Sequence, residues 1–249
     1  MFTFNGIDFS TKNIKVSEIK RPLIAPQKIS TTSIEGKAGE IFNRKVSDIF
    51  NVDVDFYLFG ATPMELIADI RELAGDLDSQ VPAKLIFKDE PDKYVMAIVE
   101  STEIEKRGRH AIISISFRCS DPYWYAIQDD IFDYETVGAK AVVRKGNAES
   151  YPIIEIKGTS STSGKFGIGA NGSMLNYTGS LTAGETLVID SERLTAYTRN
   201  ANGVVSSALS KLDVLDFPVL TKGDNNFVLS ATNGANLTTC KLICNSRWK

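Results

Sequence analysis

Short extended runs separated by turn residues recur along almost the whole chain of 249 residues. In the clearest run, Asn51–Leu58, Val, Val, Phe and Leu alternate with Asn, Asp, Asp and Tyr. Because successive side chains of a strand point to opposite faces, this period of two predicts a half-buried strand. Ile113–Cys119 alternates in the same way. A chain made mostly of such runs is predicted to be mainly β.

A single segment of the first half has the spacing of a helix. Thr62 is a suitable N-cap, Pro63 fits the first helical position, and Glu65 completes a capping-box pattern. Apolar residues follow at helical spacing: Leu66, Ile67, Ile70, Leu73, Ala74 and Leu77. We therefore expect one α-helix over about residues 62–76, inside a β-sandwich or barrel-like domain.

Two hairpins are expected beside this helix. Lys84–Lys88 and Tyr94–Val99 flank Asp89–Asp92, which reads as a turn with Pro at a favoured position. The break at Glu105–Gly108 predicts a second hairpin that leads into Ile113–Cys119.

The composition changes after the acidic segment Gln128–Glu135, and the second half is rich in Gly, Ser, Thr and Asn. Short β-type runs alternate there with turn signals, which is typical of an all-β sandwich. The runs are Ile153–Ile156, Leu187–Ile189, Val219–Leu220, Phe227–Leu229 and Lys241–Cys244, and Gly223–Asn226 is expected to be a polar turn. We predict two domains, residues 1–135 and 136–249, with the last few residues free to return to the first domain.

Charge and hydropathy exclude several classes of protein. The net charge of −3 argues against a nucleic-acid-binding surface spread over the protein. The longest apolar runs are too short to cross a bilayer, and the N-terminus lacks the features of a signal peptide, so synthesis in a cytosol is expected. Three cysteines, Cys119, Cys240 and Cys244, do not suggest a disulfide framework, and buried free thiols are expected.

The motifs that could carry chemistry have a simpler structural interpretation. Gly167–Gly172 matches GxGxxG, but no helical pattern follows it, which favours a turn between strands. Asp53 and Asp55 share one face of a strand and are interpreted as a solvated face rather than a glycosidase pair. His110 is the only histidine, and no nucleophile elbow is present. We therefore predict no catalytic residues, no metal site and no cofactor.

Large aromatic residues are clustered at Tyr123, Trp124 and Tyr125. Aromatic side chains of this size serve equally well to pack a core at a domain end and to anchor an interface. Both interpretations stay open at this point.

Five stretches, in order along nearly the whole chain, resemble the distal tail proteins of phages with long non-contractile tails. They are Phe4–Gly6, Gly36–Gly39, Asp121–Tyr125, Tyr177–Asp190 and Asp216–Phe227. The resemblance implies an N-terminal β domain that joins copies into a hexameric ring, and a galectin-like C-terminal β-sandwich. It also implies a structural role at the virion tail tip.

The partners that the resemblance implies are further copies of the chain, the tail tube protein, and the tail-tip and receptor-binding proteins. DNA would only pass through the channel of the ring. Candidate ring contacts are the loop residues Gly36, Lys37 and Gly39 and the polar strand face that carries Asp53 and Asp55.

Two other classes of protein remain as alternatives. A carbohydrate-binding module or a small glycosidase would need a concave patch of aromatic side chains or a carboxylate pair at working distance. A tail-tube subunit would explain the first half of the chain but would not need the second domain.

Overall fold

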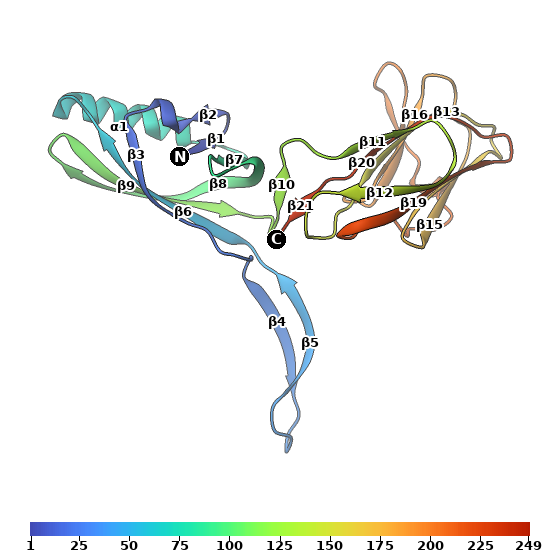
Figure 1. The fold of residues 1–249 in the computed structure, drawn as a ribbon, viewed down its shortest axis with the longest axis horizontal. Coiled ribbons are helices and arrows are strands. Elements are labelled where there is room, and N and C mark those ends of the chain that lie inside the picture. Colours follow the sequence, from blue (N-terminus) through green and yellow to red (C-terminus); the bar gives the residue numbers. More distant parts are fainter. The chain divides into compact units, whose positions relative to one another are not determined.

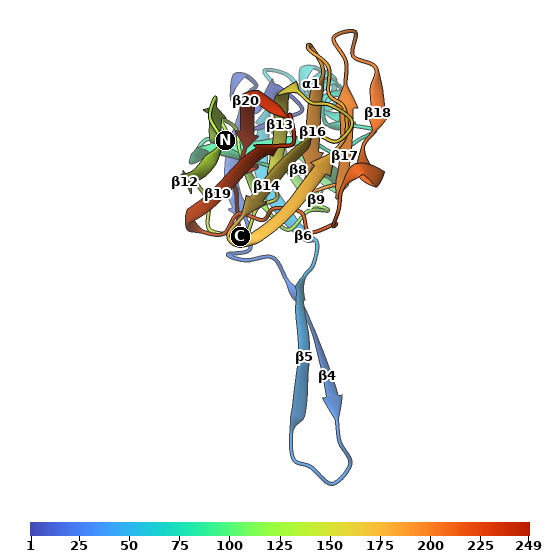
Figure 2. The same cartoon turned by 90° about the vertical axis from the view of Figure 1, so that its right-hand side faces the viewer.

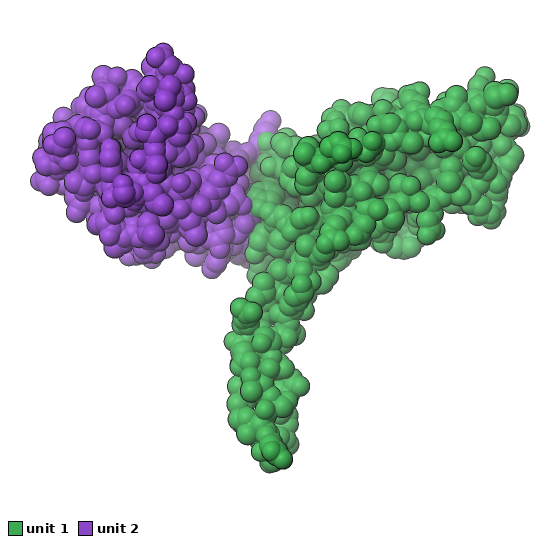
Figure 3. Space-filling view, turned by 180° about the vertical axis from the view of Figure 1, so that it is seen from behind, with its two compact units in different colours: residues 1–127, 249 green, residues 128–248 purple.

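The computed structural model describes residues 1–249, which form two compact units (Figure 3). Unit 1 comprises residues 1–127 and Lys249, and unit 2 comprises residues 128–248. Both units consist mostly of strands (Figure 1). The single α-helix and one short 3-10 helix lie in unit 1, and a second short 3-10 helix lies in unit 2. The prediction of a mainly β fold is confirmed.

Unit 1 is built on an antiparallel sheet in the order β2-β1-β7-β8-β9-β6-β3, with β10 paired to β8. Its elements are β1 (Phe2–Phe4), β2 (Ile7–Asp8), η1 (Phe9–Thr11), β3 (Ile14–Lys20), β6 (Phe50–Phe59), β7 (Ala83–Phe87), β8 (Glu90–Arg107), β9 (His110–Cys119) and β10 (Trp124–Ala126). Strands β8 and β9 form the predicted second hairpin.

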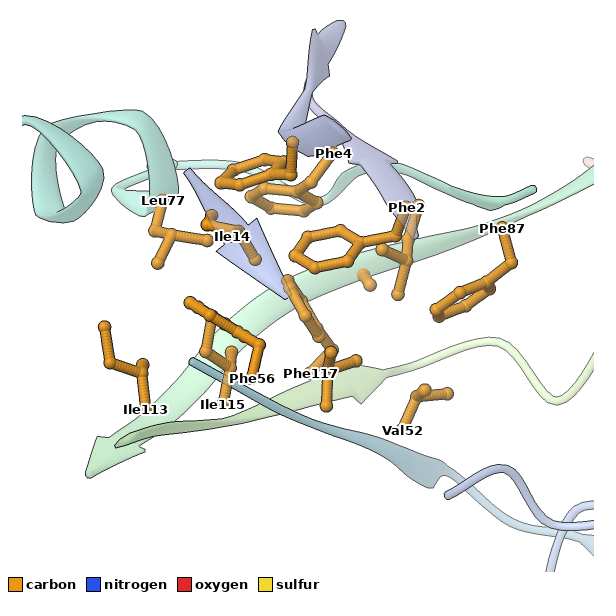
Figure 4. Close-up of a cluster of buried hydrophobic side chains, with 14 of the residues drawn as sticks. Phe2, Phe4, Ile14, Val52, Phe56, Leu77, Phe87, Ile113, Ile115 and Phe117 are labelled. Carbon is orange, nitrogen blue, oxygen red and sulfur yellow. The ribbon is translucent and has the colours of Figure 1, made fainter. Parts of the chain in front are cut away.

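The sheet of unit 1 curls over its own core. Strands β7 and β8 separate β1 from β9 in the sheet, yet the rings of Phe4 on β1 and Phe117 on β9 lie 5.1 Å apart. Phe2 stacks on Phe9 at 4.6 Å. Phe2 also lies edge-on to Phe117 at 5.8 Å, and both rings are seen in Figure 4. Several phenylalanine rings are thus buried against one another, and they form part of the core of unit 1.

The helix α1 (Pro63–Leu77) begins and ends close to the predicted positions. The backbone N–H of Glu65 donates to the hydroxyl oxygen of Thr62 at 3.2 Å, which caps the first turn. Leu66, Leu73 and Leu77 are buried in the core of unit 1.

A hairpin of β4 (Gln27–Ser33) and β5 (Glu40–Ser47) projects from unit 1 (Figure 2). Its strands pair only with each other and form a separate two-stranded sheet. A bulge between Ser30 and Thr31 leaves Asn43 as the extra residue of β5. The sequence interpretation saw the glycine-flanked loop but not these two strands.

Unit 2 is a sandwich of two antiparallel sheets, one ordered β11-β20-β13-β16-β17-β18 and the other β12-β19-β14-β15. Its strands are β11 (Ile131–Tyr134), β12 (Gly138–Arg144), β13 (Ile153–Thr159), β14 (Lys165–Ala170), β15 (Ser173–Thr178), β16 (Thr186–Asp190), β17 (Thr195–Arg199), β18 (Val205–Ser207), β19 (Gly223–Thr232), β20 (Asn236–Ile243) and β21 (Arg247–Trp248), with η2 at Leu209–Lys211. Side chains from both sheets, including Phe166, Leu187 and Phe227, form one core.

Three local predictions about turns and strands were wrong. Gly223–Asn226 is the start of β19 and not a turn. The buried Asn225 side chain accepts from the backbone N–H of Thr221 and donates to the carbonyl oxygen of Gly223, so the bend lies just before β19. Val219–Leu220 contributes only an isolated bridge to Ser150 instead of a strand. Pro91 lies inside β8 beside a register irregularity, so the turn falls one step earlier, where Phe87 pairs with Glu90.

Candidate interaction surfaces

The β4–β5 hairpin carries large apolar side chains that nothing in the chain covers. The exposed set is Ile29, Ile34, Ile41, Phe42 and Val46, with Phe42 61% exposed. A lone two-stranded hairpin is marginally stable in water, because it has no third strand and no packed face. The exposed apolar side chains of the hairpin are therefore typical of a segment that packs against a partner molecule.

The structure brings the candidate residues Gly36, Lys37 and Gly39 together at the tip of this hairpin. Gly36 and Gly39 have φ values of 79° and 85°, which glycine adopts without strain. The Lys37 backbone N–H donates to the carbonyl oxygen of Ile34 at 3.1 Å and tightens the loop. The loop presents the Lys37 side chain to solvent.

The polar face with Asp53 and Asp55 lies on a different part of unit 1, on β6. Ser116 donates to Asp53 Oδ1 at 2.7 Å, and Lys20 Nζ lies 3.7 Å from Asp55 Oδ2. On the same face, hydrogen bonds from Arg118 and Asn51 lower the pKa of Glu100 below its usual value. These side chains satisfy one another, so the face is a polar network rather than a pair of free carboxylates.

The aromatic cluster contributes mainly to packing within unit 1. The rings of Trp124 lie 6.2 Å from Phe50 and 6.1 Å from Phe87, and Tyr125 stacks on Tyr94 at 5.8 Å. Tyr123 differs, because it lines a hollow of about 590 Å³ at the root of the hairpin.

An apolar groove lies between α1 and the distal parts of β8 and β9. It encloses about 300 Å³ and is lined by Ile70, Leu73, Ala74, Leu77, Val99, Thr102, Ile104 and Ile113, with Asp78, Ser79 and Glu103 at its polar positions. Ile67 and Ile104 are each nearly half exposed. The sequence interpretation gave all six apolar helix positions to one face, but the sheet buries only part of that stripe.

Neither the groove nor the hairpin strands were found from the sequence. The sequence feature that indicates the groove is the width of the apolar face of α1, which is wider than the sheet can cover. The signal for the hairpin is the pair of β-type segments on either side of Gly36–Gly39.

The positions considered for chemistry lie in ordinary structural settings. His110 begins β9, with its ring 6.3 Å from Tyr57 and 6.1 Å from Phe59. Gly167–Gly172 forms part of β14 and the turn into β15, as predicted. Arg21 pairs with both Asp89 and Glu90. No group of three or more His, Cys, Asp or Glu residues is placed to hold a metal ion.

The cysteines are all buried and free. Burial raises the pKa of Cys119, Cys240 and Cys244 to about 12 in each case. The thiols therefore remain protonated and unreactive at neutral pH.

The chain was compared with known families and structures. The family model of the phage tail protein RIFT-related domain matches residues 7–119. The model of the siphovirus-type tail component C-terminal domain matches residues 145–248. No similar protein was found among curated sequences.

Solved structures share the fold. The Dit protein (gp 19.1) of phage SPP1, described as a paradigm of the hub adsorption apparatus in phages that infect Gram-positive hosts, is 19% identical with a TM-score of 0.81, and all of both chains is covered. A chain of the phage P2 baseplate in its activated conformation with Ca is 10% identical with a TM-score of 0.53, covering 97% of this chain and 92% of that one.

Both halves of the chain thus match phage tail domains, in the order predicted, and define a phage tail structural protein. The chain belongs to the siphophage distal tail protein family. None of its helices has the length and apolar character needed to span a membrane.

Proposed function

We propose that the chain is a distal tail hub that forms a hexameric ring at the tip of a long non-contractile tail. Unit 1 makes the ring contacts, and the ring joins the tail tube to the tail-tip and receptor-binding proteins, while DNA passes through its channel. The observation that carries this proposal is the exposed apolar β4–β5 hairpin, which lacks a partner within the chain. Family membership supports the location in the tail.

A head-to-tail ring requires two different patches on each subunit. The hairpin with Gly36, Lys37 and Gly39 supplies one patch. The candidate polar face with Asp53 and Asp55 is a separate surface, which we assign to the channel or to a neighbouring tail protein.

Light scattering on the full chain over rising concentration tests the ring. We expect a hexamer, and a chain with Phe42→Glu should remain monomeric, because a buried charge opposes the contact. Immunogold labelling of phage particles tests the location. Label confined to the tail tip supports the hub, and label along the entire tail would identify a tail-tube subunit instead.

We further propose that the protein has no catalytic role and needs no cofactor. The carboxylate Asp53 accepts from Ser116, and the only histidine packs against Tyr57 and Phe59, so no acid, base or nucleophile is assembled. A panel of glycosides and esters tests this. Hydrolysis that disappears in Asp53→Asn would overturn it.

The two units are also proposed to fold independently. Each has its own core, and the fragment Gln128–Trp248 retains β11 paired to β20. This fragment should give a β-type circular dichroism spectrum and a cooperative melt. An unfolded fragment would show that unit 2 depends on unit 1.

A further inference from the structure

We propose that the β4–β5 hairpin of one subunit docks into the α1–β8 groove of a second copy of the chain. This inference rests on the proposed ring and names the two patches that meet. The groove is the apolar recess lined by Ile70, Leu77 and Ile104, and the hairpin face that enters it carries Ile29 and Phe42.

The bulge in the hairpin assembles this face. Ile29 pairs with Lys45, and two residues further along β4, Thr31 pairs with Phe42 because Asn43 is the extra residue. Residues at i and i+2 of a strand share a face, so Ile29 and Thr31, with their partners Lys45 and Phe42, line up together. Without the bulge, Phe42 would point to the opposite face.

The groove needs an apolar occupant. Ile104 is 46% exposed although it lies beside the apolar residues Ile70 and Leu77. Leaving such surface in water costs roughly 25 cal/mol for each Å². No residue of the chain's own hairpin lines the groove, so the groove is open to an occupant from another molecule.

The charges of the two surfaces are complementary. Lys45 pairs with Ile29, so it lies on the docking face of the hairpin, and it forms no ion pair within the chain. Asp78 and Glu103 line the groove and are likewise without a salt bridge. The Lys45 ammonium group on the apolar hairpin face therefore meets acids beside the apolar groove, which favours this pairing and its orientation.

The polar face of unit 1 is the less suitable receiving surface. Its side chains already bond one another through Asn51, Ser116 and Asp53, and Glu100 is held by Arg118. Covering it with an apolar hairpin would remove water from these groups without supplying new hydrogen bonds. A second copy therefore gains more by seating its hairpin in the groove.

Thiol crosslinking tests the contact directly. A chain with Phe42→Cys is mixed with a longer, tagged chain carrying Ile104→Cys, and a thiol-reactive crosslinker with a short spacer is added. The native cysteines are buried, so they contribute little background. The control partner carries Phe59→Cys, on the polar face, where the native side chain is 45% exposed against 46% for Ile104.

We expect the Phe42→Cys chain to form a crosslinked dimer with the Ile104→Cys chain. With the Phe59→Cys chain, no such dimer should form. Lys45→Glu in the hairpin chain should reduce the yield severalfold, and Asp78→Lys with Glu103→Lys in the partner should restore it. Equal crosslinking at positions 59 and 104 would overturn the groove as the docking site.

Light scattering on the wild-type chain separates the two proposals, because Phe42→Cys itself removes an apolar side chain from the docking face. Wild-type oligomers without crosslinking at position 104 would refute the groove and leave the ring intact. A wild-type chain that stays monomeric, with no crosslinking at the highest concentration, would refute both.

Discussion

Two hairpins of this molecule both turn through residues with positive φ, but their surroundings differ. The β4–β5 hairpin turns through Gly36 and Gly39, and the β14–β15 hairpin turns through Asn171 and Gly172, all with positive φ. Strand β14 is also paired to β19 and buried in the sandwich, whereas β4 and β5 pair only with each other. Turn residues therefore suffice to form a hairpin, but its stability within the chain depends on pairing with a third strand and packing against an opposing sheet.

The largest expected difference comes from truncating one phenylalanine in each hairpin. Phe166 on β14 is 1% exposed, so Phe166→Ala should lower the free energy of unfolding of unit 2 by about 3–5 kcal/mol. Phe42→Ala should change the stability of the dilute chain by less than about 0.5 kcal/mol. Calorimetry measures both, and an equal loss at Phe42 would show that the hairpin is packed within the monomer.

A smaller loss is expected where β14 and β15 approach closely. A Cβ atom at Gly169 would lie 2.3 Å from the backbone carbonyl oxygen of Ser173. Gly169→Ala should therefore destabilise unit 2 by about 1–3 kcal/mol, because backbone must shift. Urea unfolding of the fragment Gln128–Trp248 gives the value, and an unchanged midpoint would mean that the strands separate without cost.

The same substitution in α1 should act in the opposite direction. A Cβ atom at Gly75 would meet nothing within 4 Å. Gly75→Ala should raise the stability of unit 1 by about 0.5–1 kcal/mol, since alanine loses less backbone entropy in a helix. A thermal melt that shifts downward would show that the end of α1 needs glycine.

The smallest effect on stability is expected from cutting the tip of the β4–β5 hairpin. Limited trypsin treatment should cleave after Lys37, which lies in the exposed loop. The nicked chain should melt at the temperature of the intact chain but should no longer form oligomers. Protection of Lys37 in the dilute monomer, read by mass spectrometry, would contradict an unpartnered hairpin.

Local signals were sufficient for much of the fold. The α1 start follows from Thr62 and Pro63, since a cap acts within one turn. The alternation over Asn51–Leu58 gave the correct buried face of β6, because burial on one side imposes the period. The GxGxxG match was resolved correctly by the missing helix after it.

The failures have long-range causes. Asparagine is common in turns, so the sequence predicts that Asn225 lies in a turn. Its side chain also accepts a hydrogen bond from Asn171, which is far away in the sequence, and Asn225 is buried. The strands of the β4–β5 hairpin show no burial period, because neither face is covered in the chain. The proposed docking surfaces would be covered only by a second molecule, and such a contact leaves no periodic pattern in the sequence.

The three buried thiols have a consequence for a protein that leaves the cell in which it is made. With Cys119, Cys240 and Cys244 protonated and enclosed, neither core depends on a covalent crosslink. The fold should therefore be indifferent to the redox potential of its surroundings, from a reducing cell interior to aerated medium. A tail tip built from such chains would keep the same bonds after release as it had at assembly.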